Sequence, residues 1–400
     1  YIHMAGAFGG ASRSLYEAVR SFPSGAVTPV FVAPHGSVLD FFSRLGEVIV
    51  ARGISQFDNT RYGHYRGLRW LILLREMAYL PFTLAALIRA KRRWPDADLV
   101  HVNEITGIVP WLLARRLFNV PIVLHVRSVA QEGSTSLRSQ WIDRLVRTRA
   151  DAVVAIDDTV RNSLPKDWPV SVVHNGFSAA AKTEGVADLK ARLGLDPESF
   201  KIGFVGNFLR VKGIQELVEA ARLTRDRGLN VEFIVVGGDA GSSEGIKARI
   251  LNAVGLGQNL GAEFKASIEA HGLQDRFHLT GFMPDVARAY GLMDVLCFPS
   301  HYDAPGRPIF EAAFLKVPSI AAIRHPTPDT LVNGVTGIAI APRDAGALAD
   351  AIEQLAKNPS LVVSMGEAAY QMAISTFDPV ANAARLLAIY RDVIDRRSRT

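Results

Sequence analysis

The sequence contains a single cysteine, Cys297, among 400 residues. An internal disulfide is therefore excluded, and the apolar, strand-like surroundings of Cys297 predict a small buried side chain. One thiol is compatible with a reducing compartment. We therefore expect a cytoplasmic protein.

Several catalytic motifs are also missing. The ten histidines show no His-x-x-x-His spacing on a helix, and the Gly-x-Ser-x-Gly elbow of serine hydrolases does not occur. The glycines at 237–238 and 255–257 do not meet the pattern Gly-x-Gly-x-x-Gly, which argues against a nicotinamide dinucleotide site. The Asp-x-Asp motif at 96–98 leads into a strand-like run, so we interpret it as a surface turn. The sequence predicts no metal site.

The formal net charge of +6 indicates anionic partners. Nucleic acid is not expected, because the basic residues are scattered and the motifs of the usual binding modules are absent. Residues 68–94 are very apolar and end in a basic cluster at 89–93, but their longest uncharged run, 77–88, is too short to span a bilayer. Pro81 is expected to break the apolar segment. Two interpretations remain open: one or two core helices of an α/β domain, or an interfacial helix region that seats the protein on anionic lipid.

The length exceeds what one core accommodates, so two domains of about 150 to 200 residues each are expected. In both halves, short Val- and Ile-rich runs without polar alternation, typical of buried parallel strands, alternate with helical stretches. This pattern predicts two α/β, doubly wound, Rossmann-like units in series. The expected strands are 1–4, 28–33, 47–51, 99–102, 122–126, 152–156, 170–174, 201–205, 231–236, 277–280, 295–298 and 319–322. The expected helices are 10–20, 106–118, 138–149, 214–227, 309–315, 345–356 and 378–396.

Two segments interrupt the alternation. A small, polar, alanine-rich piece at 178–185 indicates a connection between the two domains. Residues 241–272 form a long polar excursion whose second half is helical. We interpret this excursion as a surface insertion, and a lid over the site is the alternative.

Residues 299–318 predict a strand-loop-helix turn. Three prolines and Gly306 interrupt regular structure after an apolar run, and helical spacing begins at Ile309. Two carboxylates flank the turn, Asp303 and Glu311. In an open α/β sheet such a turn lies at the carboxyl end of a strand, where ligands bind, and the following helix directs free N–H groups at the site. Taken alone, Glu311 is explained as well by an ordinary acid in a first helical turn.

Other candidates lie at the same kind of position. In 203–213, a glycine turn carries Arg210 and Lys212 just before a helix, which is the combination that a diphosphate needs, although two loop cations are often only solvated. Gly9 and Gly10 end the first strand in a turn that is either plain or a ligand contact. Arg127 ends a first-domain strand, where sites of α/β domains form. The further candidates at strand ends are His101 and His125.

These residues together resemble a family: the retaining, nucleotide-sugar-dependent glycosyltransferases of family 4, which have the GT-B fold. The resemblance runs nearly end to end. Its most specific part is the family pattern Pro-Ser, then Glu-x7-Glu with a glycine three residues after the first acid, then Ala. Asp303 replaces the first Glu of that pattern and is shorter by one methylene. The matching residues are Pro299, Ser300, Asp303, Gly306, Glu311 and Ala312.

Three more segments resemble the family. Residues 206–213 are similar to its Gly-Arg-Leu-x-x-x-Lys-Gly motif, with Asn207 in place of the arginine and Arg210 as a candidate for that charge. Gly9 and Gly10 resemble its first-strand glycine loop. Arg127 occupies the position where many members have a histidine near the reacting sugar.

The resemblance implies two facing Rossmann-like domains with the catalytic cleft between them. Residues 1–178 would bind the acceptor, with a C-terminal helix at 378–400 packing back on this domain, and 179–377 would bind the nucleotide sugar. The implied catalytic residues are Asp303, Glu311, Lys212 and Arg127. The implied donor-binding residues are Asn207, Arg210, Lys212, Gly306, Arg307, Glu311, Gly9 and Gly10.

The implied activity is transfer of a hexosyl group from a nucleotide diphosphate sugar to a glycan or lipid-linked acceptor in polysaccharide biosynthesis. No cofactor or metal is required, because Lys212 and Arg210 would neutralise the diphosphate. If residues 68–94 form an interfacial region, contact with an anionic membrane would be peripheral, on its cytoplasmic face. The alternatives are another GT-B enzyme such as a nucleotide-sugar epimerase, and a non-catalytic sugar-binding or scaffold protein.

Overall fold

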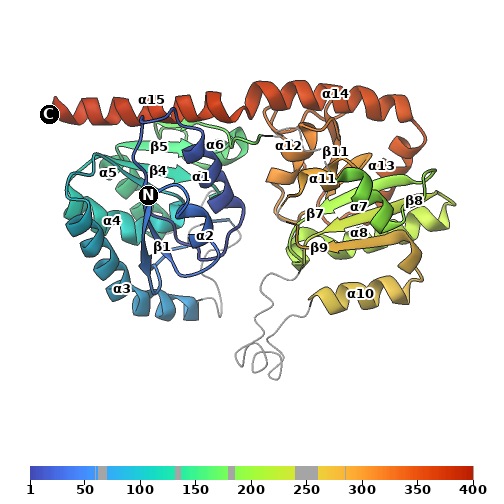
Figure 1. The fold of residues 1–400 in the computed structure, drawn as a ribbon, viewed down its shortest axis with the longest axis horizontal. Coiled ribbons are helices and arrows are strands. Elements are labelled where there is room, and N and C mark those ends of the chain that lie inside the picture. The colour runs from blue at the N-terminus through green and yellow to red at the C-terminus, as the bar shows by residue number, and fades with distance from the viewer. Residues whose placement is uncertain are drawn as a thin grey trace. The chain divides into compact units, whose positions relative to one another are not determined.

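The computed structural model describes residues 1–58, 60–61, 70–130, 137–178, 185–238, 260–283 and 285–399. The chain divides into two compact units (Figure 1). Unit 1 consists of Tyr1–Ser178 and Phe377–Thr400, and unit 2 of Ala179–Thr376. Unit 1 is therefore built from both ends of the chain.

Unit 1 contains parallel strands that a single residue joins into one layer. Ile2 forms parallel bridges to Val32 and to Val102, so it links β1 with β3. The strands follow the order β2, β1, Ile2, β3, β4, β5, β6. The bounds are β1 Val30–Pro34, β2 Glu47–Ala51, β3 Val100–Val102, β4 Ile122–Val126, β5 Ala152–Ala155 and β6 Val170–Val172.

Helices cover both faces of this sheet because successive strand residues point to opposite sides. In β4, Leu124 packs in the core beneath α3 and α4, whereas Val123 packs against α15. The helix α15 also lies beside α1 (Figure 1). The helices are α1 Gly10–Arg20, α2 Leu39–Phe42, α3 Leu71–Arg93, α4 Ile108–Phe118, α5 Leu137–Arg149, α6 Asp158–Ser163 and α15 Pro379–Ser398, with a 3-10 turn η2 at Ile105–Gly107.

Unit 2 has a six-stranded parallel sheet in the order β12, β11, β10, β7, β8, β9. The chain reverses direction across the sheet between β7 and β10, which is the topological switch point where α/β proteins bind ligands. The strands are β7 Phe200–Val205, β8 Val231–Val236, β9 Phe277–Gly281, β10 Val295–Phe298, β11 Ser319–Ala322 and β12 Gly337–Ile340. The helices are α7 Val186–Leu193, α8 Ile214–Asp226, α10 Leu260–Ala270, α11 Ala287–Tyr290, α12 Arg307–Ala313, α13 Ala345–Ala356 and α14 Pro359–Thr376, with 3-10 turns η3 at Arg210–Lys212 and η4 at Gln274–Arg276.

The predicted α/β class, parallel strands and alternation are confirmed, with differences at the margins. Residues 1–4 contribute the bridge at Ile2 instead of a strand, and α12 begins at Arg307, two residues early, because proline is tolerated in the first helical turn. The predicted helix in the second half of the 241–272 excursion is α10. Whether the excursion is a lid or a surface insertion concerns residues that lie largely outside the described ranges. The elements that the pattern did not predict are β12, α2, α6, α7, α11 and α14.

The expectation that Pro81 breaks the apolar segment is wrong. Pro81 lies inside α3, which continues as one helix to Arg93. Proline removes the N–H that would bond the carbonyl of Met77. Met77 is 62% exposed, so water can bond that carbonyl instead. The helix therefore tolerates the proline on its outer face.

Candidate active site

Two loops of unit 2 meet at the switch point. One follows β7 and leads through η3 into α8, and the other follows β10. The His301 amide donates to the Val211 carbonyl at 2.8 Å, and the Ser300 hydroxyl donates to the same oxygen at 3.3 Å. Gly213 has a φ of 75°, and a Cβ there would lie 2.0 Å from the Pro299 carbonyl oxygen, so this position requires glycine. The two loops are thus held together.

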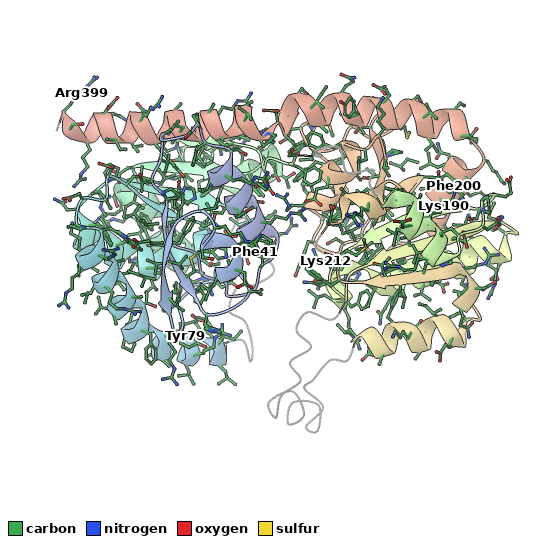
Figure 2. All side chains as sticks on the ribbon, in the orientation of Figure 1. Phe41, Tyr79, Lys190, Phe200, Lys212 and Arg399 are labelled. Atoms are coloured by element: carbon green, nitrogen blue, oxygen red, sulfur yellow. The ribbon has the colours of Figure 1, made fainter. Side chains whose placement is uncertain are left out.

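Lys212 occupies this junction between two aromatic rings. Its Nζ lies 5.5 Å from the centroid of Phe298 and 5.2 Å from that of Tyr302. Lys212 is labelled in Figure 2. Burial lowers the pKa of the ammonium below its ordinary value. In the part of the chain that the structure describes, no carboxylate forms an ion pair with Lys212. The site therefore holds a partly desolvated cation that an anion would complement.

The other cation of this loop faces the surface. Arg210 donates to Glu263 of α10 at 2.8 Å, and the two side chains are 53% and 50% exposed. Such an exposed pair contributes at most about 1 kcal/mol. Asn207 is also exposed. Arg210 is therefore free to exchange Glu263 for another anion at little cost.

Glu311 lies in α12 as part of a buried network. Its Oε1 accepts from Arg307 Nε at 2.9 Å, and its Oε2 accepts from the Tyr290 hydroxyl at 3.0 Å. The Arg307 and Glu311 side chains are 10% and 4% exposed. Gly306 precedes this helix, and a Cβ there would lie 2.5 Å from the Phe298 ring. The carboxylate is thus fixed in place beside the loop that carries Asp303.

Asp303 has an unusual backbone and an unpredicted partner. Its φ is 51°, in the left-handed region that aspartate tolerates better than most residues. Its Oδ1 accepts from the Arg324 amide at 2.8 Å and its Oδ2 from Arg324 Nη1 at 2.7 Å. Arg324 follows β11, the strand next to β10. The shorter acid therefore bridges two neighbouring strand ends.

In unit 1, the glycine loop leads directly into α1. Gly9 is the N-cap residue of this helix, and its amide donates to the Ser12 hydroxyl at 2.7 Å. No atom lies within 4 Å of where a Cβ of Gly9 would be, so packing does not require glycine there. Gly10 is the first helical residue. This loop lies at the carboxyl side of Ile2, which places it at the switch point of unit 1.

Arg127 is buried at the end of β4 and ties three strand ends together. Its Nε donates to Asn103 after β3, and its Nη1 donates to Asn175 after β6 at 2.9 Å. Its Nη2 lies 3.3 Å from His125 Nδ1. Its amide donates to Glu104 at 3.3 Å.

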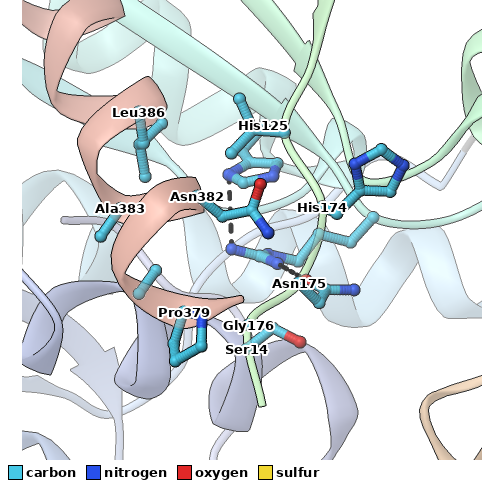
Figure 3. A pocket seen from close by; sticks show the side chains of 12 residues that line it. Ser14, His125, His174, Asn175, Gly176, Pro379, Asn382, Ala383 and Leu386 are labelled. Carbon is cyan, nitrogen blue, oxygen red and sulfur yellow. Dashed lines mark hydrogen bonds between the residues drawn. The ribbon is translucent and has the colours of Figure 1, made fainter. Parts of the chain in front are cut away.

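A cavity of about 10 Å³ beside α15 is lined by Arg127 and by His125, Asn175 and Asn382, the last three labelled in Figure 3. That volume suits about one water molecule. The cavity is therefore too small for a sugar.

Three buried histidines of unit 1, His3, His101 and His125, lie close to this guanidinium. Burial, and secondarily the Arg127 charge, lowers the pKa of His3 to about 3 and holds the pKa values of His101 and His125 well below the ordinary value. Burial raises the pKa of Glu104, whose carboxylate accepts from Ser128 at 2.7 Å. These three histidines are therefore neutral, and Arg127 carries the positive charge beside them.

The structure brings together Lys212, Gly306, Arg307 and Glu311 at the switch point of unit 2. Gly9, Gly10 and Arg127 belong to unit 1. The described residues contain no group of three or more His, Cys, Asp or Glu side chains suited to a metal ion. Sequence reasoning missed four participants. Three of them lie within two residues after a strand, and that position is their one signal in the sequence. They are Asn103, Glu104, Tyr290 and Arg324.

Comparison with known proteins bears on both units. The glycosyl transferases group 1 family matches residues 186–372, and Glycosyltransferase Family 4 matches residues 8–180. Alpha-D-kanosaminyltransferase of Streptomyces kanamyceticus is 25% identical over 304 residues, covering 71% of this chain and 73% of that protein. D-inositol 3-phosphate glycosyltransferase of Corynebacterium glutamicum is 24% identical over 395 residues, covering 92% and 90%.

A solved structure shows the same fold. Anabaena HepE, in complex with UDP and glucose, has a TM-score of 0.72 at 18% identity, and the match covers 97% of each chain. The two family matches lie one in each unit and together span most of the chain. The chain therefore belongs to the group 1, family 4 glycosyltransferases of GT-B fold, and it is an enzyme that transfers sugar.

Proposed function

We propose that this enzyme moves a sugar from a nucleoside diphosphate sugar, with retention at the anomeric carbon. Lys212 is the observation that carries the donor assignment. It is a partly desolvated cation at a switch point, and none of the described carboxylates pairs with it. A diphosphate supplies the complementary charge. The presence of UDP in the HepE complex supports the same donor class.

The proposed chemistry is electrostatic. When the bond between the anomeric carbon and the diphosphate oxygen breaks, negative charge grows on the leaving group. Lys212 stabilises that charge, and Arg210 joins it by leaving Glu263. A preorganised cation in such a position lowers the activation free energy by about 3 kcal/mol. Because these side chains supply the positive charge, the proposed reaction requires no metal ion or cofactor.

The acids of the second loop hold the donor. The Glu311 carboxylate accepts from Arg307 and Tyr290, and because each carboxylate oxygen has two lone pairs, we propose that it also accepts from a ribose hydroxyl. Asp303 and the adjoining loop at Gly306 hold the sugar, and Asn207 contacts the donor from the first loop. Arg307 acts through Glu311, by fixing its carboxylate.

Unit 1 binds the acceptor in this proposal. Gly9 and Gly10 offer an open backbone at the start of α1. Arg127 positions the strand ends that surround it, because its guanidinium bonds Asn103 and Asn175. The acceptor that we propose is a glycan or lipid-linked saccharide in polysaccharide biosynthesis, in the cytoplasm.

A thermal-shift screen of UDP-, GDP- and ADP-sugars tests the donor class. A donor at one hundred times its Kd stabilises the folded protein by about 2.7 kcal/mol, which raises Tm by several degrees. The matching nucleotide without sugar serves as the control. A protein that no nucleotide sugar stabilises contradicts the proposal. With the donor identified, the anomeric configuration of the product by NMR tests retention, and an epimerised donor without acceptor indicates the epimerase alternative.

Replacing Asp303 and Arg324 separately tests which of the two residues contacts the donor sugar. If Asp303 holds the sugar itself, Asp303→Ala lowers kcat/KM by about 10- to 100-fold, the range for a lost bond to a charged group. Arg324→Ala then lowers kcat/KM only slightly, because the backbone N–H at position 324 still donates to Asp303. Equal losses in both variants and in the double variant identify Arg324 as the group that meets the substrate. Asp303→Asn, which suits the same φ, controls for the loop backbone.

A further inference from the structure

The helix α3 presents a continuous apolar face to solvent. Six large apolar side chains on it or at its N-cap are 38% to 63% exposed. They recur at three- and four-residue spacing, which places them on one side of the helix. Isolated exposed apolar residues need no explanation, but a contiguous patch marks an interaction surface. The exposed residues are Trp70, Leu71, Leu74, Met77, Leu80 and Leu84.

The opposite face of α3 is anchored in unit 1. Ala86, Leu87 and Ala90 are buried in the core that contains α4. Glu76 is buried as well, and its carboxylate accepts from the Gln56 amide at 2.7 Å. The expectation that this segment is too short to cross a bilayer is wrong for the whole helix, because by length and composition α3 is long and apolar enough. Crossing would strip these contacts and leave Glu76 in hydrocarbon, so the helix is suited to lie on a membrane rather than to span it.

The charges on α3 favour an anionic partner. The helix carries five basic residues and one acid, Glu76, which is buried. Arg89 and Arg92 are exposed beside the apolar face. Arg93 pairs with Glu47 at 2.7 Å, while no described acid forms an ion pair with Arg89 or Arg92. A second copy of α3 would offer these arginines no exposed carboxylate, whereas anionic lipid headgroups would.

We propose that the exposed face of α3 is a docking surface for an anionic phospholipid bilayer, with Leu74 and Met77 inserted below the headgroups and Arg89 and Arg92 against them. Apolar burial and headgroup attraction act together in such interfacial helices. The surface lies in unit 1, which we propose binds the acceptor. This membrane-binding role is separate from the transfer chemistry. The surface would hold the enzyme at the bilayer, where lipid-linked saccharides are found.

Vesicle co-sedimentation of the full chain tests this surface. We expect binding to vesicles of phosphatidylcholine with phosphatidylglycerol at low ionic strength, weaker binding at high ionic strength, and little binding to phosphatidylcholine alone. The double variant Leu74→Gln, Met77→Gln should bind at least about tenfold more weakly. Arg92→Glu should reduce binding severalfold on the anionic vesicles only.

Matched controls lie in unit 2. Val363 of α14 is 72% exposed, and Lys190 of α7 is exposed. Val363→Gln matches the apolar-to-glutamine changes and Lys190→Glu matches the charge reversal at Arg92, so both variants should leave vesicle binding unchanged. Absence of binding to anionic vesicles at low ionic strength overturns the proposal. The proposal is also overturned if the protein forms a concentration-dependent dimer and the Leu74→Gln, Met77→Gln variant is monomeric, since the exposed face of α3 would then be a dimer interface. The assay contains no donor, so either outcome leaves the proposed reaction standing.

Discussion

Replacing Lys212 by methionine is expected to lower kcat by roughly a hundredfold, the equivalent of about 3 kcal/mol of lost transition-state stabilisation. Methionine keeps the unbranched stem between Phe298 and Tyr302 and removes only the charge. The free energy of unfolding should not fall, because the variant no longer desolvates an ammonium. Steady-state kinetics with the identified donor, alongside chemical denaturation, measures both quantities.

Two further variants sharpen this prediction. Lys212→Arg keeps the charge in altered geometry and should retain part of the activity. Its donor binding should stay constant at alkaline pH, whereas the parent enzyme should lose donor affinity as pH rises through the lowered pKa of Lys212 and the ammonium is lost. Lys190→Met, on the surface of unit 2, should change nothing. Full activity in Lys212→Met would show that the diphosphate does not depend on this residue.

Replacing Glu311 by alanine is expected to have the second large effect, on stability as well as binding. It removes the carboxylate that Arg307 and Tyr290 share in the interior. Breaking a buried ion pair from one side costs about 3–5 kcal/mol of unfolding free energy. If Glu311 also accepts from the ribose, nucleotide affinity should fall by about 10- to 100-fold.

Milder variants separate the two effects of Glu311. Tyr290→Phe removes one bond to the carboxylate and should cost about 1 kcal/mol of stability with little change in nucleotide Kd. Glu311→Gln keeps the volume and one carbonyl oxygen but loses the ion pair. Nucleotide Kd by calorimetry, at a temperature where each variant is folded, is the deciding measurement. An unchanged Kd in Glu311→Gln and Glu311→Ala removes the ribose role and leaves a structural one.

The sequence predicted the elements whose signals are local. β8 and β10 are short apolar runs bounded by turns, and the parallel pairing of each with its neighbouring strands follows from the intervening helices. The spacing from Asp303 to Glu311 is local too, and it placed both acids on one loop and its helix. The meeting of the Lys212 loop with that loop depends on the strand order, which the resemblance implied but the periodicity could not give.

Side-chain hydrogen bonds between residues far apart in the sequence could not be predicted from local patterns. Asp303 bonds Arg324 after another strand, and Glu311 bonds Tyr290 from another helix. Both pairs depend on side-chain geometry across elements, for which one sequence carries no pattern. The continuity of α3 was missed for a different reason. Whether Pro81 breaks a helix depends on which face it occupies, and that is set by the core beneath it.

The composition of unit 1 from both chain ends has a consequence for biosynthesis. Val123 and Val154, on the face of the sheet that α15 covers, pack against Leu386 and Tyr390, which the ribosome adds only after the whole of unit 2. Unit 2 is contiguous in sequence, so it is complete in the nascent chain before unit 1 can be. We therefore expect unit 2 to fold before unit 1 is complete, with one face of the amino-terminal sheet uncovered until α15 has been synthesised.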